Sequence, residues 1–270
     1  MISACLVIYN EETLLPRCLE SLQGVIDEIV IVHDGPCSDK SIQIAKTYGA
    51  KIFIKEHVGE AEYHRPFCFS EAHGDWILHI DADEYLSGDL RQSIPELITN
   101  DKIDSFAFGW PITVNGHYVE NGYFSKEPRP SLFRTSKMYM LGLTHEHPRT
   151  YGVTTIRNDL LLEHRPLESR SGYSFKNFWG EGFKRAKLRA CQLRTLSRLP
   201  EFNITDPKTN PTFKYYQQRL NWKLFYLFYD PLRLLSSYVM KGVFFAGNDS
   251  ARIALYRLGM TILNYYCLFR

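Results

Sequence analysis

The chain has 270 residues, of which 44% are hydrophobic and 14% aromatic, and its formal net charge is +2. This apolar content is sufficient to bury a large core, which excludes intrinsic disorder as the main state. The six cysteines are scattered and form no CxxC pair, so neither a zinc site nor a disulfide framework is predicted.

The small net charge conceals a strong asymmetry along the chain. Before residue 170 there are 15 Lys or Arg residues against 25 Asp or Glu, whereas from Arg170 onward there are 17 against 5. An acidic part suits a divalent cation, and a basic part suits phosphates, nucleic acid or anionic lipid. We therefore predict two domains, residues 1–169 and residues 170–270.

The first 80 residues alternate between apolar runs and stretches whose apolar residues have helical spacing. The pattern predicts strands at 4–9, 26–32, 51–55 and 76–80, and helices at 13–22, 40–48 and 60–73. Such alternation predicts an α/β fold with a mostly parallel central sheet. Beyond residue 85 the elements become mixed, with strands predicted at 105–110 and 159–163, and from residue 174 the pattern is helical.

Polar side chains follow three of the predicted strands. They are Asn10 and Glu11 after the first strand, Asp34 after the second, and Asp81 and Asp83 after the fourth. In an open parallel sheet, ligands bind outside the carboxyl ends of the strands. Asn and Asp also cap helices and form turns, and this alternative stays open for each of the first three residues taken singly.

Asp81 and Asp83 are the sharpest chemical signal in the chain. Two carboxylates at this spacing, in a segment leaving a sheet, can face the same side and hold Mg²⁺ or Mn²⁺ together with phosphate oxygens. A DxD pattern alone is weak, because an Asp-rich turn has the same sequence. The alternative of a simple turn therefore stays open at this point.

Five runs in the first 85 residues resemble the donor-binding half of family 2 glycosyltransferases, which have the GT-A fold. The runs are Val7-Ile-Tyr-Asn-Glu-Glu12, Cys18-Leu-Glu-Ser-Leu22, Asp27-Glu-Ile-Val-Ile-Val-His-Asp-Gly35, Ser38-Asp-Lys-Ser41 and Gly74-Asp-Trp-Ile-Leu-His-Ile-Asp-Ala-Asp-Glu84. Later pieces are similar to the branch that glucosylates lipopolysaccharide cores and related glycolipids. They are Arg134, Thr144-His-Glu-His-Pro148, His164 and Lys241-Gly-Val-Phe-Phe245.

The resemblance implies a role for each matching residue of the donor half. Tyr9, Asn10 and Glu11 would line the nucleoside pocket, Asp34 would bind the base or ribose, Arg65 would face the diphosphate, Asp81 would lie near ribose and metal, and Asp83 would ligate the metal directly. One departure is visible. The small residues usual around the Arg are replaced by Tyr63-His64-Arg65-Pro66-Phe67.

Glycosyl transfer sets further demands on side chains. Charge develops on the leaving phosphate, and Asp83 with its cation, Arg65 and His164 fit the stabilising roles. Inversion also needs a base for the acceptor hydroxyl, and Glu146 is our candidate. His164 follows an apolar strand and is predicted to complete the metal site, although a purely structural histidine fits as well. His145 and His147 flank Glu146 in an extended pattern whose alternative is simple surface polarity.

We therefore predict a metal-dependent, inverting transferase of a hexose from a nucleotide-diphosphate sugar, with a UDP-sugar favoured. The predicted acceptor is a lipid-linked or cell-envelope glycan. One alternative is a sugar-nucleotide pyrophosphorylase, although no Gly-rich phosphate loop follows the first strand. A second alternative is a non-catalytic, membrane-surface protein that binds sugar nucleotides.

The basic C-terminal part is rich in aromatic residues, both between 172 and 198 and between 213 and 229. A cationic face beside an aromatic face suits a helix in the headgroup region of an anionic membrane. We expect a cytoplasmic protein, peripheral on the cytoplasmic face of a membrane. The alternative is a helical cap packed on the sheet. No nucleic-acid partner is expected, because no recognised binding module accompanies the charges, and the sequence leaves the oligomeric state open.

Overall fold

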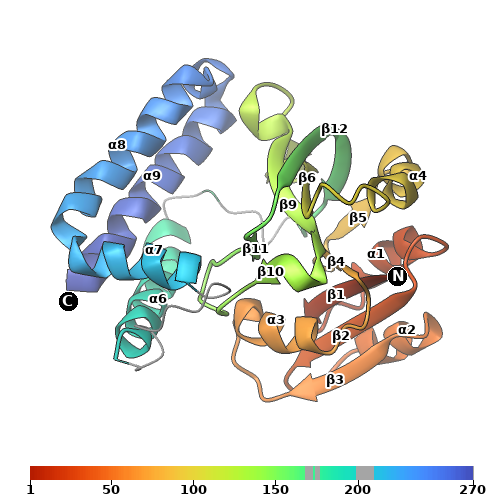
Figure 1. Cartoon of the computed structure of the whole chain (residues 1–270). Helices are drawn as coiled ribbons and strands as arrows, with labels where there is room; N and C mark the ends of the chain where they lie inside the picture. The colour runs from red at the N-terminus through yellow and green to blue at the C-terminus, as the bar shows by residue number, and fades with distance from the viewer. Residues whose placement is uncertain (168–172, 174–176, 199–209, 270) are drawn as a thin grey trace. The chain divides into compact units, whose positions relative to one another are not determined.

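The structure, a computed structural model, describes residues 1–167, 173, 177–198 and 210–269, with residues 210–214 described by their backbone alone (Figure 1). The chain divides into two compact units. The first unit comprises Met1–Tyr118, Ser125–Gly142 and Glu146–Arg170, and the second comprises Val119–Phe124, Leu143–His145 and Ser171–Arg270. The predicted boundary after residue 169 falls within 168–172, which lies outside the described residues.

An eight-stranded sheet in the order β3-β2-β1-β4-β9-β6-β12-β5 forms the centre of the first unit. Its strands are β1 (Ile2–Ile8), β2 (Glu28–Asp34), β3 (Lys51–Lys55), β4 (Trp76–His79), β5 (Glu84–Leu86), β6 (Ser105–Trp110), β9 (Glu127–Arg134) and β12 (Thr154–His164). Strands β3, β2, β1 and β4 are parallel, and β6 is parallel to β12, while β9 and β5 are antiparallel to their neighbours. The predicted α/β fold with a mostly parallel central sheet is thus confirmed.

Helices cover both faces of the sheet. They are α1 (Leu15–Leu22), α2 (Ser41–Thr47), α3 (Ala61–Ser70) and α4 (Gly88–Leu97). Because side chains alternate along a strand, Leu6 of β1 packs in the same core as α1, α2 and α4, whereas Cys5 and Val7 pack with α3 on the opposite face. In α1, Leu15, Cys18, Leu19 and Leu22 are fully buried, which is the spacing that predicted the helix.

Strand β9 was not predicted from the sequence. Its Pro128 and Pro130 lack the backbone N–H groups of a strand ladder, so they argue against a central strand. The sheet accommodates them because the register of β9 against β6 shifts between Phe106 and Ala107. Two small two-stranded sheets complete the first unit, β7 (Thr113–Val114) with β8 (His117–Tyr118), and β10 (Met138–Tyr139) with β11 (Arg149–Thr150).

The second unit is helical. Its long helices, drawn in cyan to blue in Figure 1, are α6 (Phe183–Leu196), α7 (Asn210–Asn221), α8 (Lys223–Met240) and α9 (Asn248–Phe269). A π-helical turn, Phe178–Gly182, precedes α6, and a 3₁₀ helix, Val243–Phe245, follows α8. Of the helices in the described part of the chain, none is long and apolar enough to cross a bilayer.

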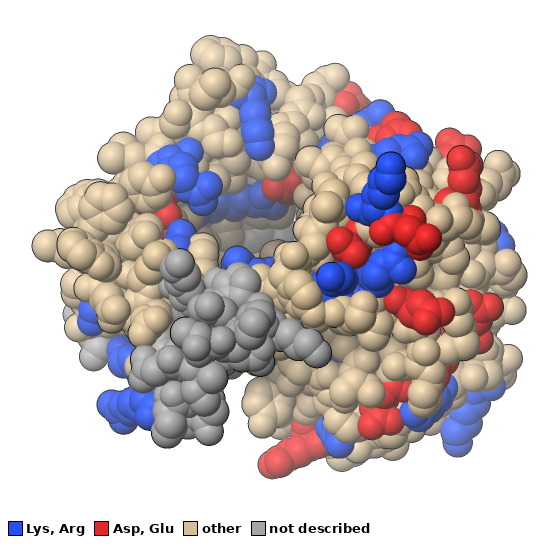
Figure 2. Space-filling view, in the orientation of Figure 1, with Lys and Arg blue, Asp and Glu red and all other residues tan. Residues whose placement is uncertain are grey.

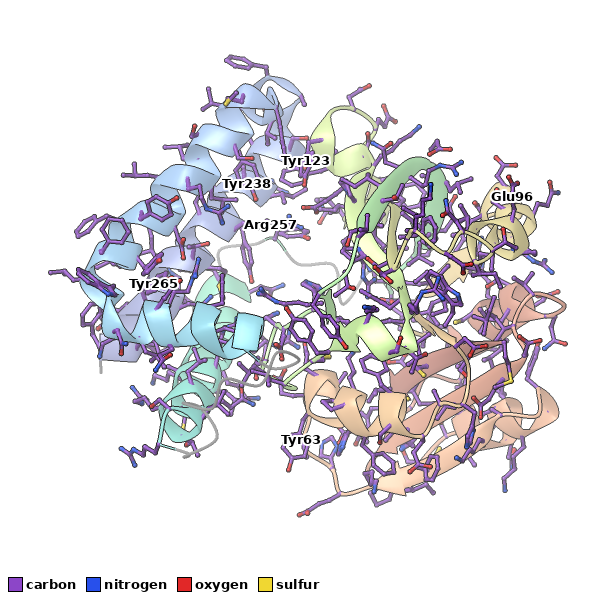
Figure 3. All side chains as sticks on the ribbon, in the orientation of Figure 1. Tyr63, Glu96, Tyr123, Tyr238, Arg257 and Tyr265 are labelled. Atoms are coloured by element: carbon purple, nitrogen blue, oxygen red, sulfur yellow. The ribbon has the colours of Figure 1, made fainter. Side chains whose placement is uncertain are left out.

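A buried ion pair joins three helices of this unit. Arg219 of α7 donates to both carboxylate oxygens of Asp230 in α8, at 3.0 and 3.1 Å. The hydroxyl of Tyr265 in α9, labelled in Figure 3, donates to the same carboxylate. The side chains of Arg219 and Asp230 are only 14% and 10% exposed. Asp230 is the one acidic residue of α8, and its charge is therefore paired inside the unit.

We predict that Asp230→Ala lowers the free energy of unfolding by about 3 kcal/mol, because it leaves a buried guanidinium without its partner. Urea unfolding of the whole chain measures the change. Asp249→Ala provides the matched control, since Asp249 and Arg252 form an exposed pair at 3.8 Å whose loss costs less than about 1 kcal/mol. Equal stability of the two variants would contradict the prediction.

Candidate functional site

The carboxyl ends of β2, β1 and β4 meet at one edge of the sheet. Ile8 lies beside His33 in the register, and Cys5 lies beside His79. The segments that leave these strands therefore run side by side. This arrangement brings Tyr9, Asp34, Asp81 and Asp83 to the same edge, as their positions after successive strands predicted.

Asp81 is clamped between two arginines. Arg65 of α3 donates through Nη2 to Asp81 Oδ1 at 2.8 Å, and Arg129 of β9 donates through Nη2 to Oδ2 at 2.9 Å. Burial alone would raise the pKa of Asp81, but the two guanidiniums hold it well below its usual range. Asp81 is therefore ionised at neutral pH.

Glu84 anchors the other side of this cluster. Its side chain is buried, and it accepts hydrogen bonds from the Asp81 N–H at 2.9 Å and from Trp110 Nε1 at 2.7 Å. Arg129 Nη1 forms an ion pair with the same carboxylate. Two guanidiniums and two carboxylates thus balance one another in the buried part of the site. The Nε atoms of Arg65 and Arg129 have no hydrogen-bond partner within the described residues. Each arginine therefore has one N–H donor that these residues do not use.

His79 lies fully buried beside this cluster. Burial and then the nearby charge of Arg65 lower its pKa well below the usual histidine value. Its ring packs edge-on against Phe69, with centroids 5.8 Å apart. His79 therefore acts as a neutral spacer behind Asp81 and adds no charge to the site.

Asp83 is the carboxylate that faces His164. Its Oδ2 lies 3.5 Å from His164 Nε2, and the ring of His164 stacks on Trp110 with centroids 4.1 Å apart. Because Trp110 is itself bonded to Glu84, the stack fixes the orientation of the imidazole. Asp83 also lines a cavity of about 180 Å³ with Arg17 and Arg165, which leaves room for a ligand beside it.

Asp83 and His164 fit a divalent cation that is held jointly with a substrate. Within the ranges that the structure describes, no three His, Cys, Asp or Glu side chains converge as a ready-made metal site. Mg²⁺ sites of nucleotide enzymes commonly use one or two protein ligands and take the rest from phosphates and water. Each Asp81 oxygen already accepts from one arginine, so its predicted role as a metal ligand would have to use the lone pairs that remain.

Tyr9 and His57 form an aromatic platform at the β1–β2 side of the edge. Their ring centroids are 4.5 Å apart, and both side chains are about half exposed. Asn10, with a positive φ of 52°, turns the chain here and accepts the Ser38 N–H at 2.9 Å. The Glu11 N–H donates to the Ser41 hydroxyl at 2.7 Å. The predicted nucleoside-pocket residues of this segment therefore lie together, around one partly open ring face.

Asp34 serves the loop that follows β3. Its Oδ1 accepts from the Val58 N–H at 2.7 Å and from His64 at 2.9 Å, while Oδ2 accepts from the Gly59 N–H at 2.8 Å. Burial alone would raise the pKa of Asp34, but these donors lower it. With both oxygens engaged, Asp34 shapes the wall beside Tyr9, and its predicted contact with base or ribose would have to use lone pairs that remain.

The segment around Arg65 is helical although it contains Pro66. Helix α3 covers the whole departure from the family pattern. Tyr63 is 58% exposed and projects from the helix (Figure 3). Phe67 packs edge-on against Phe53, with centroids 5.2 Å apart. The bulky residues are therefore accommodated without displacing Arg65 from the site edge.

Glu146 is buried and accepts the Leu141 N–H at 2.9 Å. His145 and His147 on either side are exposed, as the predicted alternation implies. The extended conformation predicted for these residues is wrong, because Thr144 and His145 form a turn in which His145 has a φ of 59°. The turn, and not a strand, sets the direction of the Glu146 side chain.

Five residues of the site were not predicted from the sequence: His57, His79, Glu84, Trp110 and Arg129. Arg129 lies on the unpredicted strand β9, between two prolines. Trp110 ends a predicted strand, and a polar aromatic residue at a strand end is a signal that could have identified it. Glu84 directly follows the DxD pair, where a third acid is a signal for a charge network.

Comparisons with known proteins point to one family. Residues 3–162 match the family model described as "Glycosyl transferase family 2". An uncharacterized glycosyltransferase of Rickettsia typhi is 33% identical over 108 residues, which cover 39% of this chain and 35% of that protein. The lipopolysaccharide core biosynthesis glycosyltransferase LpsC of Rhizobium meliloti is 32% identical over 133 residues, covering 47% of each. The matches thus span less than half of these relatives.

Two solved structures are similar to this chain at lower sequence identity. S. aureus TarS 1–349 covers 100% of this chain and 92% of its own, with 14% identity and a TM-score of 0.47. Glucosyl-3-phosphoglycerate synthase from Mycobacterium tuberculosis, crystallised with Mn²⁺, UDP-glucose and phosphoglyceric acid, covers 41% of this chain and 44% of its own, with 23% identity and a TM-score of 0.31.

We predict that Asp81→Asn lowers the free energy of unfolding by about 3 kcal/mol at pH 7, because two buried guanidiniums lose their shared charge. Asp81 has a lower pKa in the folded state than in the unfolded state, where it is about 3.9. Its contribution to the free energy of unfolding is therefore complete above about pH 3.9 and is lost as the pH falls toward the folded-state pKa. The difference in free energy of unfolding between wild type and Asp81→Asn should therefore be constant from about pH 8 to pH 5 and become smaller below about pH 4.

Urea unfolding at a series of pH values measures this gap. Asp159→Asn is the control, since Asp159 pairs with Arg157 on the surface, where the side chains are 60% and 36% exposed. Its loss should stay within about 1 kcal/mol at every pH. A gap for Asp81→Asn that matches this control at pH 7 would show that the clamp contributes little.

Proposed function

The chain belongs to glycosyl transferase family 2, and on this basis we propose that it is a metal-dependent, inverting enzyme that moves a hexose from a nucleotide-diphosphate sugar to a lipid-linked or cell-envelope glycan. The observation that carries the proposal is the pairing of Asp83 with His164, 3.5 Å apart, next to Asp81 and its two arginines. This edge offers a cation site and fixed positive charge within one patch.

The donor fits the two ends of this edge. The platform of Tyr9 and His57 presents a ring face on which a nucleoside base stacks. Arg65 and Arg129 supply guanidinium donors, which suit the paired oxygens of a diphosphate. We favour a UDP-sugar, with glucose as the hexose, on the resemblance to the branch that glucosylates lipopolysaccharide cores, and the similarity to LpsC supports a cell-envelope glycan as the acceptor.

The guanidinium groups of Arg65 and Arg129 are already positioned to stabilise the departing nucleoside diphosphate. Arg65 and Arg129 lie in a buried cluster, where a fixed charge acts more strongly than in water. If a phosphate oxygen replaced Asp81 as the acceptor for one of these arginines, the Asp81 carboxylate would be free to turn toward Asp83. A divalent cation bound by Asp83 and His164 supplies further positive charge to the leaving phosphate.

Glu146 is proposed as the base that takes the proton of the attacking acceptor hydroxyl. Its carboxylate is held by the Leu141 N–H and is shielded from bulk water. Proton removal on the face opposite the leaving group accounts for inversion at the anomeric carbon. The base is thus supplied by a turn, which is separate from the strand ends that hold the donor.

The family match favours transfer over the pyrophosphorylase alternative. The ordered carboxylates Asp81 and Asp83 also speak against a protein that only binds sugar nucleotides, since such a protein would not need to keep them. We further propose that the reaction takes place at the cytoplasmic face of a membrane, where a lipid-linked acceptor would be presented.

We predict that Asp83→Ala lowers kcat by about a hundredfold or more, because the cation loses its carboxylate ligand. The same variant should lose the Mn²⁺-dependent part of UDP affinity, measured by calorimetry with and without Mn²⁺. Asp101→Ala is the matched control, since its side chain is 96% exposed. If Asp83→Ala binds UDP with Mn²⁺ as tightly as wild type does and turns over normally, the proposed metal site is wrong.

We predict that Glu146→Gln lowers kcat by about 10²- to 10⁴-fold and leaves the dissociation constant for UDP unchanged. The amide keeps the shape of the side chain but cannot accept the proton. Glu120→Gln, at an exposed position, controls for the loss of one charge. Normal turnover of Glu146→Gln would assign the base to another residue, while weakened UDP binding would instead indicate a structural role.

A further inference from the structure

Helix α8 presents a long apolar stripe to the surface. Its members recur every three or four residues, and each is at least 38% exposed: Leu224, Phe225, Phe228, Tyr229, Leu232, Leu235, Val239 and Met240. Trp222 precedes the helix with 66% exposure, and Phe245 in the following 3₁₀ helix is 88% exposed. Side chains of this size are normally buried, so a stripe along a whole helix marks an interaction surface.

Helix α6 does not share this property, although its basic and aromatic sequence suggested a role at the membrane. Its small apolar residues Ala186, Ala190 and Leu193 are buried. The exposed side holds Lys184 and Lys187 beside Leu188. Residues 172 and 174–176 of the same predicted segment lie outside the described residues. The apolar face of α6 is thus used for packing, whereas that of α8 is not.

The exposed charged residue of α8 and the charged residue that follows the helix are both basic. Asp230, the acidic residue of α8, is buried in its pair with Arg219. Arg233 and Lys241 are exposed next to the stripe, and Lys223 is half-buried at the start of the helix. No charged residue falls among the stripe positions, and Figure 2 shows the visible surface of α8 as mostly uncharged. An apolar strip edged by cations complements an anionic bilayer.

We propose that α8 and the 3₁₀ helix after it lie flat in the headgroup region of an anionic lipid bilayer. The helix has 18 residues and is therefore about 27 Å long, so it offers an extended line of contact. Trp222 and Tyr229 combine apolar rings with a polar group, as residues at the membrane interface do.

A second copy of the chain is a less suitable occupant of this surface. Two α8 stripes placed face to face would bring Arg233 and Lys241 of each copy together without an exposed acid on the helix to offset them. A bilayer containing anionic lipid neutralises the same cations. The charge pattern therefore favours lipid over self-association. Membrane contact is also independent of the proposed glycosyl transfer, because it needs no nucleotide.

Flotation of the full chain with vesicles tests the proposal. We expect binding to vesicles of phosphatidylcholine with phosphatidylglycerol, and a loss of at least tenfold for the double variant Phe228→Glu and Leu232→Glu. The control is Ile54→Glu with Ile156→Glu, two positions of the first unit that are each 58% exposed, and it should bind like wild type. Unchanged UDP binding by both double variants shows that they remain folded.

The charged residues give a second readout. Arg233→Gln with Lys241→Gln should weaken binding to the anionic vesicles by about 25-fold, at roughly fivefold for each charge near the surface. Binding of wild type should fall as salt is raised. The proposal is overturned if Phe228→Glu and Leu232→Glu leave vesicle binding intact. It is also overturned if light scattering shows a wild-type dimer that this variant dissociates while neither protein binds vesicles, because the stripe would then join two copies.

Discussion

The site depends on mutual neutralisation of four charges at the carboxyl edge of the sheet, of which three are buried and the fourth, Asp81, is 29% exposed. Arg65, Arg129, Asp81 and Glu84 come from separate elements, and each would be costly to bury alone. Their pairing therefore fixes α3, β9 and the segment after β4 in one arrangement. The geometry of the candidate site and the stability of the sheet depend on the same contacts, so substitutions here should affect both.

This charge cluster causes the two aspartates of the DxD pair to face different partners. Asp81 is turned to the arginines, whereas Asp83, two residues later, is turned to His164. The two carboxylates thus face different partners, two guanidiniums for Asp81 and an imidazole for Asp83. Glu84 connects the two halves, because it bonds to Arg129 on one side and to Trp110, which stacks on His164, on the other.

Charge is handled differently in the helical unit. Asp230 is withdrawn into a pair with Arg219, which leaves the outer side of α8 apolar with basic residues beside it. An exposed acid at that position would repel anionic lipid. The same ion pair therefore stabilises three helices and determines which sign of charge the surface presents.

The sequence alone determined the first half of the sheet and the residues at its edge. Strand and helix periodicities are local, and parallel strands necessarily bring their carboxyl ends together, so Tyr9, Asp34, Asp81 and Asp83 could be placed without coordinates. Arg129 could not be joined to them, because it lies on β9, whose two prolines argue against a central strand although the strand pairs with both β4 and β6.

The tertiary structure also determined which side-chain atoms are already engaged and which local conformation carries a side chain. It showed that both oxygens of Asp34 serve the following loop, and that a turn carries Glu146. The sequence indicated a basic segment rich in aromatic residues, but only packing showed that Ala186, Ala190 and Leu193 of α6 are buried while the apolar stripe of α8 is exposed. Local pattern establishes what a segment prefers, whereas its partners come from distant parts of the chain, and these are set by the fold as a whole.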